Sequence, residues 1–276
     1  MNYRKLKENT CKLLLWLSAL ITVIVLVFII GFIVVKGYKG LSINYLTKDY
    51  SATGTGGILP MILSTLYTVL LSIAIATPIG ILSAIYLVEY AKQGKLVKVI
   101  RFATESLSGI PSIVYGLFGE IFFVQLLKFG FSILAGSLTV SIIILPVIIR
   151  TTEEALKSVP QSYREASLGL GATRFQTLYK VIVPSALPGI LSGVILSIGR
   201  VVGESAAILL TTGTVAKMAT SILSSSRTLT VHAYLVAKET GNINAAATVG
   251  IVLLVIIFVL NSIAKLITKK FSKANY

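Results

Sequence analysis

Cysteine and histidine are almost absent from this sequence, and charged residues are scarce. Of 276 residues, one is a cysteine (Cys11), one is a histidine (His232), and 13% are charged. A single cysteine cannot form an internal disulfide, and a single histidine cannot build a multi-histidine metal site. Soluble domains carry about 25% charged residues, so this chain has too little polar surface to cover a water-soluble globule. These shortages exclude a soluble enzyme, a disulfide scaffold and a disordered regulator.

Long apolar blocks stand where the charges are missing. Hydrophobic residues make up 55% of the chain, and charge-free stretches of about 20 residues are long enough to span a bilayer. The first block follows a basic N-terminus, as in a signal peptide, but it is too long for a cleavable one. We therefore predict an all-α, polytopic membrane protein with a single transmembrane domain over residues 1–276. Its six predicted spans are 13–35, 61–88, 106–127, 129–149, 187–210 and 241–264.

Basic residues are divided unevenly between the two sides of these spans. With a cytoplasmic N-terminus, the inner segments hold 17 of the 25 lysines and arginines, and the outer segments hold 7. This bias predicts that both termini are cytoplasmic and that 36–60 and 211–243 lie outside. The net charge of +15 then faces anionic lipid headgroups, and no basic stretch interleaved with aromatic residues indicates nucleic acid.

The predicted inner connection, 150–184, has the pattern of short helices. Helix starts are indicated at 151–154, 158–161 and 173–176, where Ser or Thr is followed by acidic residues or Gln. Glycine at 171 is suited to the left-handed conformation that ends a helix. The middle helix has one face formed by Tyr163, Ala166, Ser167 and Leu170. Such a helix either docks against another protein or only ties two spans together, and the spacing supports both readings equally.

The same segment resembles a known signature. It contains Glu165-Ala166-Ser167-x-x-x-Gly171 and, after nine residues, Val181-Ile182-Val183-Pro184. Permease subunits of ABC importers carry Glu-Ala-Ala, three residues, Gly, nine residues and Ile-x-Leu-Pro, from which this chain departs by small, conservative changes. The resemblance implies a type I ABC importer permease (MetI-like) fold, in which the 158–172 helix couples the chain to a separate ATPase. The coupling residues that it implies are Tyr163, Glu165, Ala166, Ser167, Gly171 and Pro184.

Three further stretches are similar to the phosphate-specific permeases, and most of all to their A-type subunit. They are Gly56–Leu66, Ser108–Gly116 and Gly199–Ala206. This resemblance implies a permease that moves inorganic phosphate across the bacterial cytoplasmic membrane. It also implies a paralogous second permease, two copies of a cytoplasmic ATPase subunit and an extracytoplasmic phosphate-binding protein as partners.

The chain itself is not predicted to be an enzyme or to hold a metal or cofactor. No G-x-x-x-x-G-K-[ST] loop occurs, so we expect ATP and Mg²⁺ to bind the partner ATPase. Two alternatives stay open, namely a permease for another small anion such as sulfate or molybdate, and a polytopic membrane enzyme. The enzyme is disfavoured because neither G-x-S-x-G nor H-E-x-x-H occurs. His232, in a predicted outer connection, is expected to be a plain surface or interface residue.

Arg200 and Glu204, within the fifth predicted span, are the candidate solute-binding residues. An unpaired arginine there is costly, and the i,i+4 spacing places both residues on one helix face. They either neutralise each other or line the translocation path, where Arg200 offers its planar fork to phosphate oxygens and Glu204 holds it. We predict the second arrangement. Ser108 and Ser112, which flank Gly109-Ile110-Pro111, are predicted to line the same path.

Overall fold

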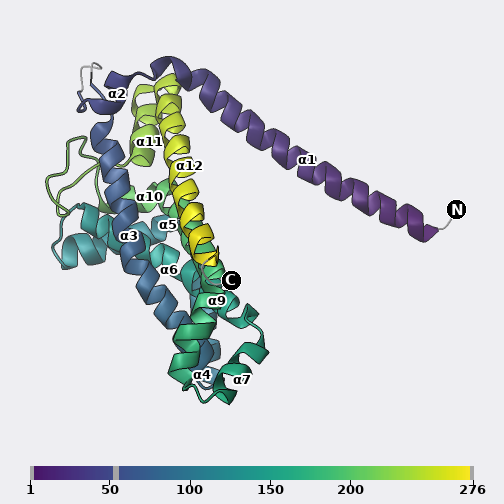
Figure 1. Ribbon diagram of the computed structural model, residues 1–276. Helices are drawn as coiled ribbons and strands as arrows, with labels where there is room; N and C mark the ends of the chain where they lie inside the picture. Colours follow the sequence, from purple (N-terminus) through teal and green to yellow (C-terminus); the bar gives the residue numbers. More distant parts are fainter. Residues whose placement is uncertain (1–2, 52–55, 274–276) are drawn as a thin grey trace.

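A computed structural model describes residues 3–51 and 56–273. Within these ranges every regular element is helical and no strand occurs, which confirms the predicted all-α class (Figure 1). The α-helices are α1 (Tyr3–Gly37), α2 (Ile43–Thr47), α3 (Leu59–Ile85), α4 (Lys95–Ser108), α5 (Ser112–Gly119), α6 (Ile133–Ser158), α7 (Gln161–Gly169), α8 (Arg174–Thr177), α9 (Val183–Gly203), α10 (Ala206–Thr211), α11 (Leu229–Thr240) and α12 (Ile243–Lys273). A 3₁₀ turn, η1 (Tyr38–Gly40), and three π-helical segments, η2 (Tyr86–Tyr90), η3 (Glu120–Leu126) and η4 (Leu178–Ile182), adjoin them.

Helices α3, α6 and α9 form the centre of the molecule, and small residues let their backbones approach. A Cβ added to Gly80 of α3 would lie 2.6 Å from Ile148 Cγ2 of α6. The Ser72 hydroxyl donates to the Ser137 carbonyl at 3.1 Å, and the Ser141 hydroxyl donates to the Ser72 carbonyl at 3.2 Å. Close approach and interhelical hydrogen bonds hold these helices together in lipid, where burying apolar side chains brings little advantage.

Five described helical segments are long and apolar enough to cross a membrane, and a sixth crossing requires a bent pair. In that pair, α4 and the α5–η3 segment meet at 100°. The third predicted span, 106–127, is therefore not one helix: it crosses this bend, which falls at Gly109-Ile110-Pro111. Pro111 has no N–H to continue a helix, and the residue before a proline is driven out of the helical region, so α4 ends at Ser108 and α5 begins at Ser112.

The helices that carry the fourth and fifth predicted spans differ in extent from those spans. Helix α6 continues without a break to Ser158, so there is no separate helix start at 151–154. Helix α9 ends at Gly203, and α10 is a separate short helix after it. The predicted outer connection 211–243 contains the helix α11.

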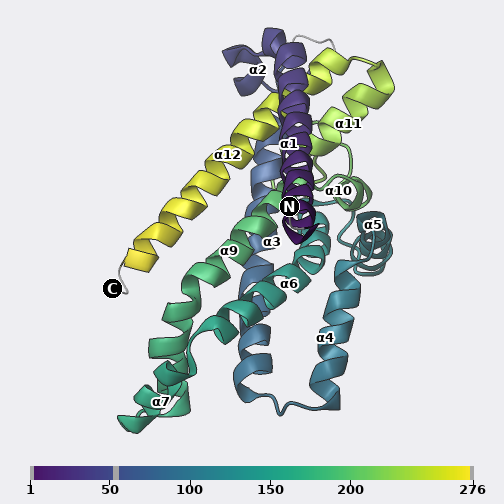
Figure 2. The same cartoon turned by 90° about the vertical axis from the view of Figure 1, so that its right-hand side faces the viewer.

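The connections lie at opposite ends of the bundle. Figures 1 and 2 show α2, α11 and the start of α12 together at one end, and α7 with the start of α4 at the other. The described part of 36–60 therefore lies at the same end as α11 and the start of α12, as the topology predicts. Which side faces the cytoplasm stays a prediction.

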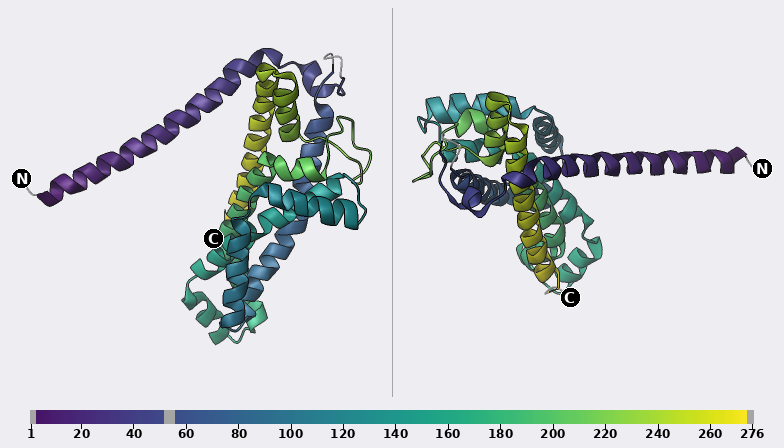
Figure 3. Two further views of the ribbon diagram at one scale, coloured as in Figure 1. Left: turned by 180° about the vertical axis from the view of Figure 1, so that it is seen from behind. Right: turned by 90° about the horizontal axis from the view of Figure 1, so that it is seen from above.

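Helix α1 leaves the body of the protein and projects away from it (Figure 3). Its contacts are at its C-terminal end, where the Thr248 hydroxyl donates to the Gly37 carbonyl at 2.8 Å and Ile33 packs against Gly250. None of its most apolar 18-residue window is buried within the described part of the chain. Lipid or another protein must therefore cover this helix, because so large an apolar surface is unstable in water.

Candidate translocation and coupling sites

The predicted coupling helix is α7, and it lies at one extreme of the molecule (Figure 1). Tyr163 is 49% exposed and Leu170, just after the helix, is 90% exposed. Glu165 and Ala166 are exposed as well, whereas Ser167 turns inward and its hydroxyl lies 2.9 Å from that of Thr177 in the segment that follows. The helix therefore offers a free outer face and an inner face held by the body of the protein.

Of the signals predicted around the ends of α7, those at Gly171 and Thr173 are confirmed and the one at Ser158 is wrong. Gly171 has φ +84, the left-handed conformation expected at a helix end. Thr173 and Gln176 form the predicted capping box at the start of α8. The predicted start at Ser158 is wrong, because its hydroxyl donates to the Ala155 carbonyl inside α6 at 2.8 Å. Pro184 lies in the first turn of α9, where its missing N–H is not needed.

Arg164, on the inner face of α7, was missed by the sequence reasoning. Its Nη2 lies 2.6 Å from Oε1 of Glu89, which is 75 residues earlier in the chain. Glu89 directly follows the predicted span 61–88, and Arg164 lies within the predicted connection 150–184. The only signals in the sequence were an isolated acid, Glu89, after one span and a base, Arg164, in the coupling segment. No local pattern predicts that these two residues pair.

Arg200 lies in the last turn of α9, and Glu204 follows the end of that helix. The backbone of Glu204 is extended, with φ −73 and ψ 130, so it leaves the helix face. Glu204 Oε1 accepts hydrogen bonds from the N–H groups of Ser205 and Ala207 at 3.1 and 3.2 Å. Glu204 therefore caps α10, and the predicted holding of Arg200 by Glu204 is wrong. Among the residues that the structure describes, no carboxylate forms an ion pair with Arg200.

The bend between α4 and α5 lies against this α9–α10 break. The Tyr115 hydroxyl donates to the Leu107 carbonyl at 2.7 Å, which ties the two arms of the bend together. Tyr115 packs in one buried cluster with Ala207, and a Cβ at Gly116 would lie 2.9 Å from the Ala207 Cα. The bend that carries Ser108 and Ser112 thus adjoins the Arg200–Glu204 segment. Tyr115, a contact residue between the two, lies inside the 108–116 stretch but was not singled out.

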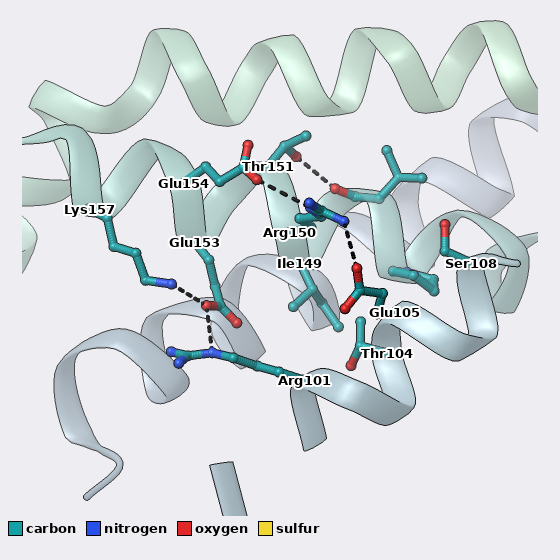
Figure 4. Close-up of a pocket in the computed structure, with 12 residues that line it drawn as sticks. Arg101, Thr104, Glu105, Ser108, Ile149, Arg150, Thr151, Glu153, Glu154 and Lys157 are labelled. Atoms are coloured by element: carbon teal, nitrogen blue, oxygen red, sulfur yellow. Dashed lines mark hydrogen bonds and ion pairs between the residues drawn. The ribbon is translucent and has the colours of Figure 1, made fainter. Parts of the chain in front are cut away.

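A pocket of about 370 Å³, lined mostly by charged and polar residues, opens between α4 and α6 (Figure 4). Glu153, with its side chain 8% exposed, accepts from Arg101 Nε at 3.0 Å and from Lys157 Nζ at 2.8 Å. Arg150 lies between two further carboxylates, those of Glu105 and Glu154. The pocket is lined by Arg101, Thr104, Glu105, Ser108, Pro146, Val147, Ile149, Arg150, Thr151, Glu153, Glu154 and Lys157. All three of its cations are paired, which distinguishes them from Arg200.

His232 is buried, so the expectation of a plain surface residue is wrong. Its side chain is 4% exposed in α11, its Nδ1 lies 3.3 Å from Nη1 of Arg227, and its ring meets the edge of Tyr50. Burial, with a smaller contribution from the Arg227 guanidinium, lowers the pKa of His232 to about 4. The His232 imidazole is therefore neutral at pH 7 and has a structural role in its contacts with Arg227 and Tyr50. No group of three or more potential metal ligands occurs among the described residues.

Comparisons with known proteins match most of the chain. The family described as "binding-protein-dependent transport system inner membrane component" matches residues 76–273. The probable ABC transporter permease protein YqgI of Bacillus subtilis is 38% identical over 211 residues, which are 76% of this chain and 72% of that protein. The phosphate transport system permease protein PstA of Pasteurella multocida is 38% identical over 209 residues, which are 75% of this chain and 74% of that protein.

Two solved structures share the fold. A chain of a bacterial alginate ABC transporter, in complex with an alginate pentasaccharide-bound periplasmic protein, superposes with a TM-score of 0.71 at 14% identity, covering 98% of both chains. A chain of the MetNI methionine ABC transporter in an inward facing conformation gives a TM-score of 0.65 at 20% identity, covering 78% of this chain and 95% of that chain. The predicted ABC importer permease fold is confirmed.

Proposed function

This chain belongs to the family of binding-protein-dependent transport system inner membrane components, and we propose that the solute it helps to import is inorganic phosphate. As the permease of an ABC importer it is a non-enzymatic component of the complex. Support for phosphate comes from the phosphate transport permeases of Pasteurella multocida and other bacteria. The fold alone does not select the solute, because the solved relatives are transporters of methionine and alginate.

The observation that carries the proposal is Arg200, a cation at the end of a membrane-spanning helix with no carboxylate partner among the described residues. An unpaired arginine in this environment is costly, and an anion passing beside it offsets that cost. The guanidinium presents parallel donors that match two oxygens of one phosphate. Because Glu204 is occupied with the backbone of α10, Arg200 is free for this contact.

The surroundings of Arg200 suit a path for a hydrated anion. Ser108 and Ser112 flank the bend beside it, and the pocket between α4 and α6 continues from Ser108. In that pocket each cation is already paired, which keeps a passing anion from being trapped. We assign Arg200, Ser108 and Ser112 to the path, and Glu204 to shaping the break beside it.

The remaining parts of the proposal concern partners and energy. We assign the exposed face of α7, with Tyr163, Glu165 and Ala166, to contact with a cytoplasmic ATPase subunit that binds ATP and Mg²⁺. Two such subunits, a paralogous second permease and an extracytoplasmic phosphate-binding protein would complete the complex in the bacterial cytoplasmic membrane. Helix α1, with its uncovered apolar surface, is available to lipid and to the second permease.

Uptake by the complete complex in proteoliposomes tests the solute. We expect ATP-dependent accumulation of labelled phosphate that excess unlabelled phosphate abolishes and that equal concentrations of sulfate or molybdate leave unchanged. Accumulation of sulfate or molybdate in place of phosphate would overturn the assignment and leave the importer class intact.

A further inference from the structure

One side chain, that of Arg164, joins α7 to the ends of two membrane-spanning helices. Its Nη2 lies 2.6 Å from Glu89 Oε1 in η2, the segment that continues α3. Its Nη2 and Nη1 also donate to the carbonyl oxygens of Leu156 and Val159, each at 3.2 Å. Leu156 is in the last turn of α6 and Val159 follows that helix. The last carbonyls of a helix have no partner within it, so the guanidinium completes the end of α6 while it pairs with α3.

Both side chains of this contact are shielded from solvent, whereas each other ion pair at the same end has at least one side chain that is 35% exposed or more. The side chains of Arg164 and Glu89 are 17% and 21% exposed, whereas those of Arg150 and Glu154 are both 65% exposed. An exposed pair contributes little, but removing one partner of a shielded pair leaves the other charge uncompensated. A shielded guanidinium with three acceptors on two elements is therefore a rigid connection.

We propose that Arg164 is the positioning residue that makes α7 move as one body with the inner ends of α3 and α6. The proposal rests on the proposed function in one respect, since α7 is taken as the helix that an ATPase subunit contacts. Helix α7 has nine residues and an exposed outer face, so movement applied to that face reaches the membrane helices through its inner contacts and through the chain that joins it to α6 and α8. Arg164 transmits it to α3 through Glu89 and to α6 through the two carbonyls.

The chemistry of the contact selects the variants. Arg164→Gln removes the charge and the fork of donors. Arg164→Lys keeps the charge, but a single ammonium does not reproduce the planar fork. Glu89→Gln keeps an acceptor oxygen without the charge. Lys98→Gln serves as the matched control, because Lys98 is an exposed cation on α4 at the same end of the molecule.

A distance measurement that involves no solute tests the rigid connection directly. Spin labels on Ser162→Cys of α7 and Lys92→Cys, just beyond η2, in a Cys11→Ser background, report the separation of α7 from α3 in the assembled complex. We expect one narrow distribution that is the same with and without ATP in the parent and in Lys98→Gln. It should broaden at least about twofold in Arg164→Gln and less in Arg164→Lys. A distance that shifts on ATP binding in the parent, or stays narrow in Arg164→Gln, overturns the proposal.

The functional measurement is the amount of phosphate transported per ATP hydrolysed. We expect this ratio to fall about tenfold or more in Arg164→Gln and to stay unchanged in Lys98→Gln. The double variant Glu89→Arg with Arg164→Glu should recover part of it, since it restores the ion pair without the donors to α6. An unchanged ratio in Arg164→Gln also overturns the proposal. If the parent complex takes up no phosphate, the proposed solute is wrong, and the distances still decide the role of Arg164. If Arg164→Gln fails to assemble, the same comparisons are made with Glu89→Gln.

Discussion

The Glu204 carboxylate accepts a hydrogen bond from the backbone N–H of Ala207 at 3.2 Å, across the break between α9 and α10. This contact replaces the i,i+4 pair with Arg200 that the spacing suggested. It shapes the chain where a membrane-spanning helix ends, and among the described residues it leaves the arginine without a carboxylate partner. The two residues therefore have separable roles, and their substitutions should have different effects.

Glu204→Gln should reduce stability and phosphate uptake only slightly, whereas Glu204→Ala should reduce both strongly. Glutamine keeps an oxygen that can accept from the N–H groups of Ser205 and Ala207, whereas alanine leaves them uncapped, at a cost of about 0.5–2 kcal/mol. Thermal unfolding of the purified complex and phosphate uptake measure the difference. Equal losses in both variants would show that the charge of Glu204, and not its acceptor oxygen, is what matters.

Arg200→Gln should reduce phosphate uptake about tenfold to a hundredfold, and Arg200→Lys should reduce it less. Glutamine removes the charge, and lysine keeps it but loses the bidentate geometry. Losing a charged hydrogen bond costs about 1.5–3 kcal/mol, which corresponds to roughly a tenfold to hundredfold loss of rate or affinity. Initial rates of phosphate uptake in proteoliposomes measure this loss, and co-purification of the subunits checks that each variant assembles. Near-normal uptake by Arg200→Gln would contradict the assignment.

Gly171→Ala should weaken coupling, whereas Gly169→Ala should not. A Cβ would meet nothing within 4 Å at either position, but Gly171 alone has positive φ, at +84. An alanine there costs about 1–2 kcal/mol of backbone strain and shifts the end of α7. The ATP hydrolysis stimulated by the binding protein is the measurement. Glu165→Lys, which reverses a charge on the exposed face, should reduce it as well. If Gly171→Ala and Glu165→Lys both hydrolyse ATP and transport as well as the Gly169→Ala control, α7 only ties the spans together.

Acid should destabilise the cluster around His232 in α11. Because its pKa is lowered from 6.5 to about 4 in the folded protein, the unfolded chain takes up the proton first as the pH falls. The stability associated with the neutral ring is present above pH 6.5 and is lost toward pH 4, by on the order of 2 kcal/mol at pH 5. The Tm should therefore drop more between pH 7 and pH 5 in the parent protein than in His232→Gln. Equal drops would assign the pH dependence to other groups.

Single cysteines at Ser51 and Ser162, in a Cys11→Ser background, test the orientation. The excess of basic residues on one side predicts that an impermeant thiol reagent labels Ser51→Cys from outside and labels Ser162→Cys only after the membrane is opened. Intact cells or oriented vesicles provide the measurement. Labelling of Ser162→Cys alone from outside would invert the topology.

The sequence by itself determined the features that depend on neighbouring residues. Apolar runs long enough for a bilayer predicted α1, α3, α6, α9 and α12, because the need to satisfy every backbone group in lipid leaves a helix as the outcome. The left-handed Gly171 and the Thr173–Gln176 capping box were also predicted, because both are local features of the sequence. Each needs only a few consecutive residues.

Tertiary structure alone decided the break after Gly203 and which distant side chains meet. The direction of the chain after Gly203 turned Glu204 from a partner of Arg200 into a cap for α10. Packing of α11 buried His232, and the return of the chain to the end of the bundle that holds α7 brought Arg164 to Glu89 across 75 residues. Hydropathy and spacing carry no information on such contacts, because they depend on how whole helices pack, and small residues such as Gly80 and Gly116 set how closely the helices approach.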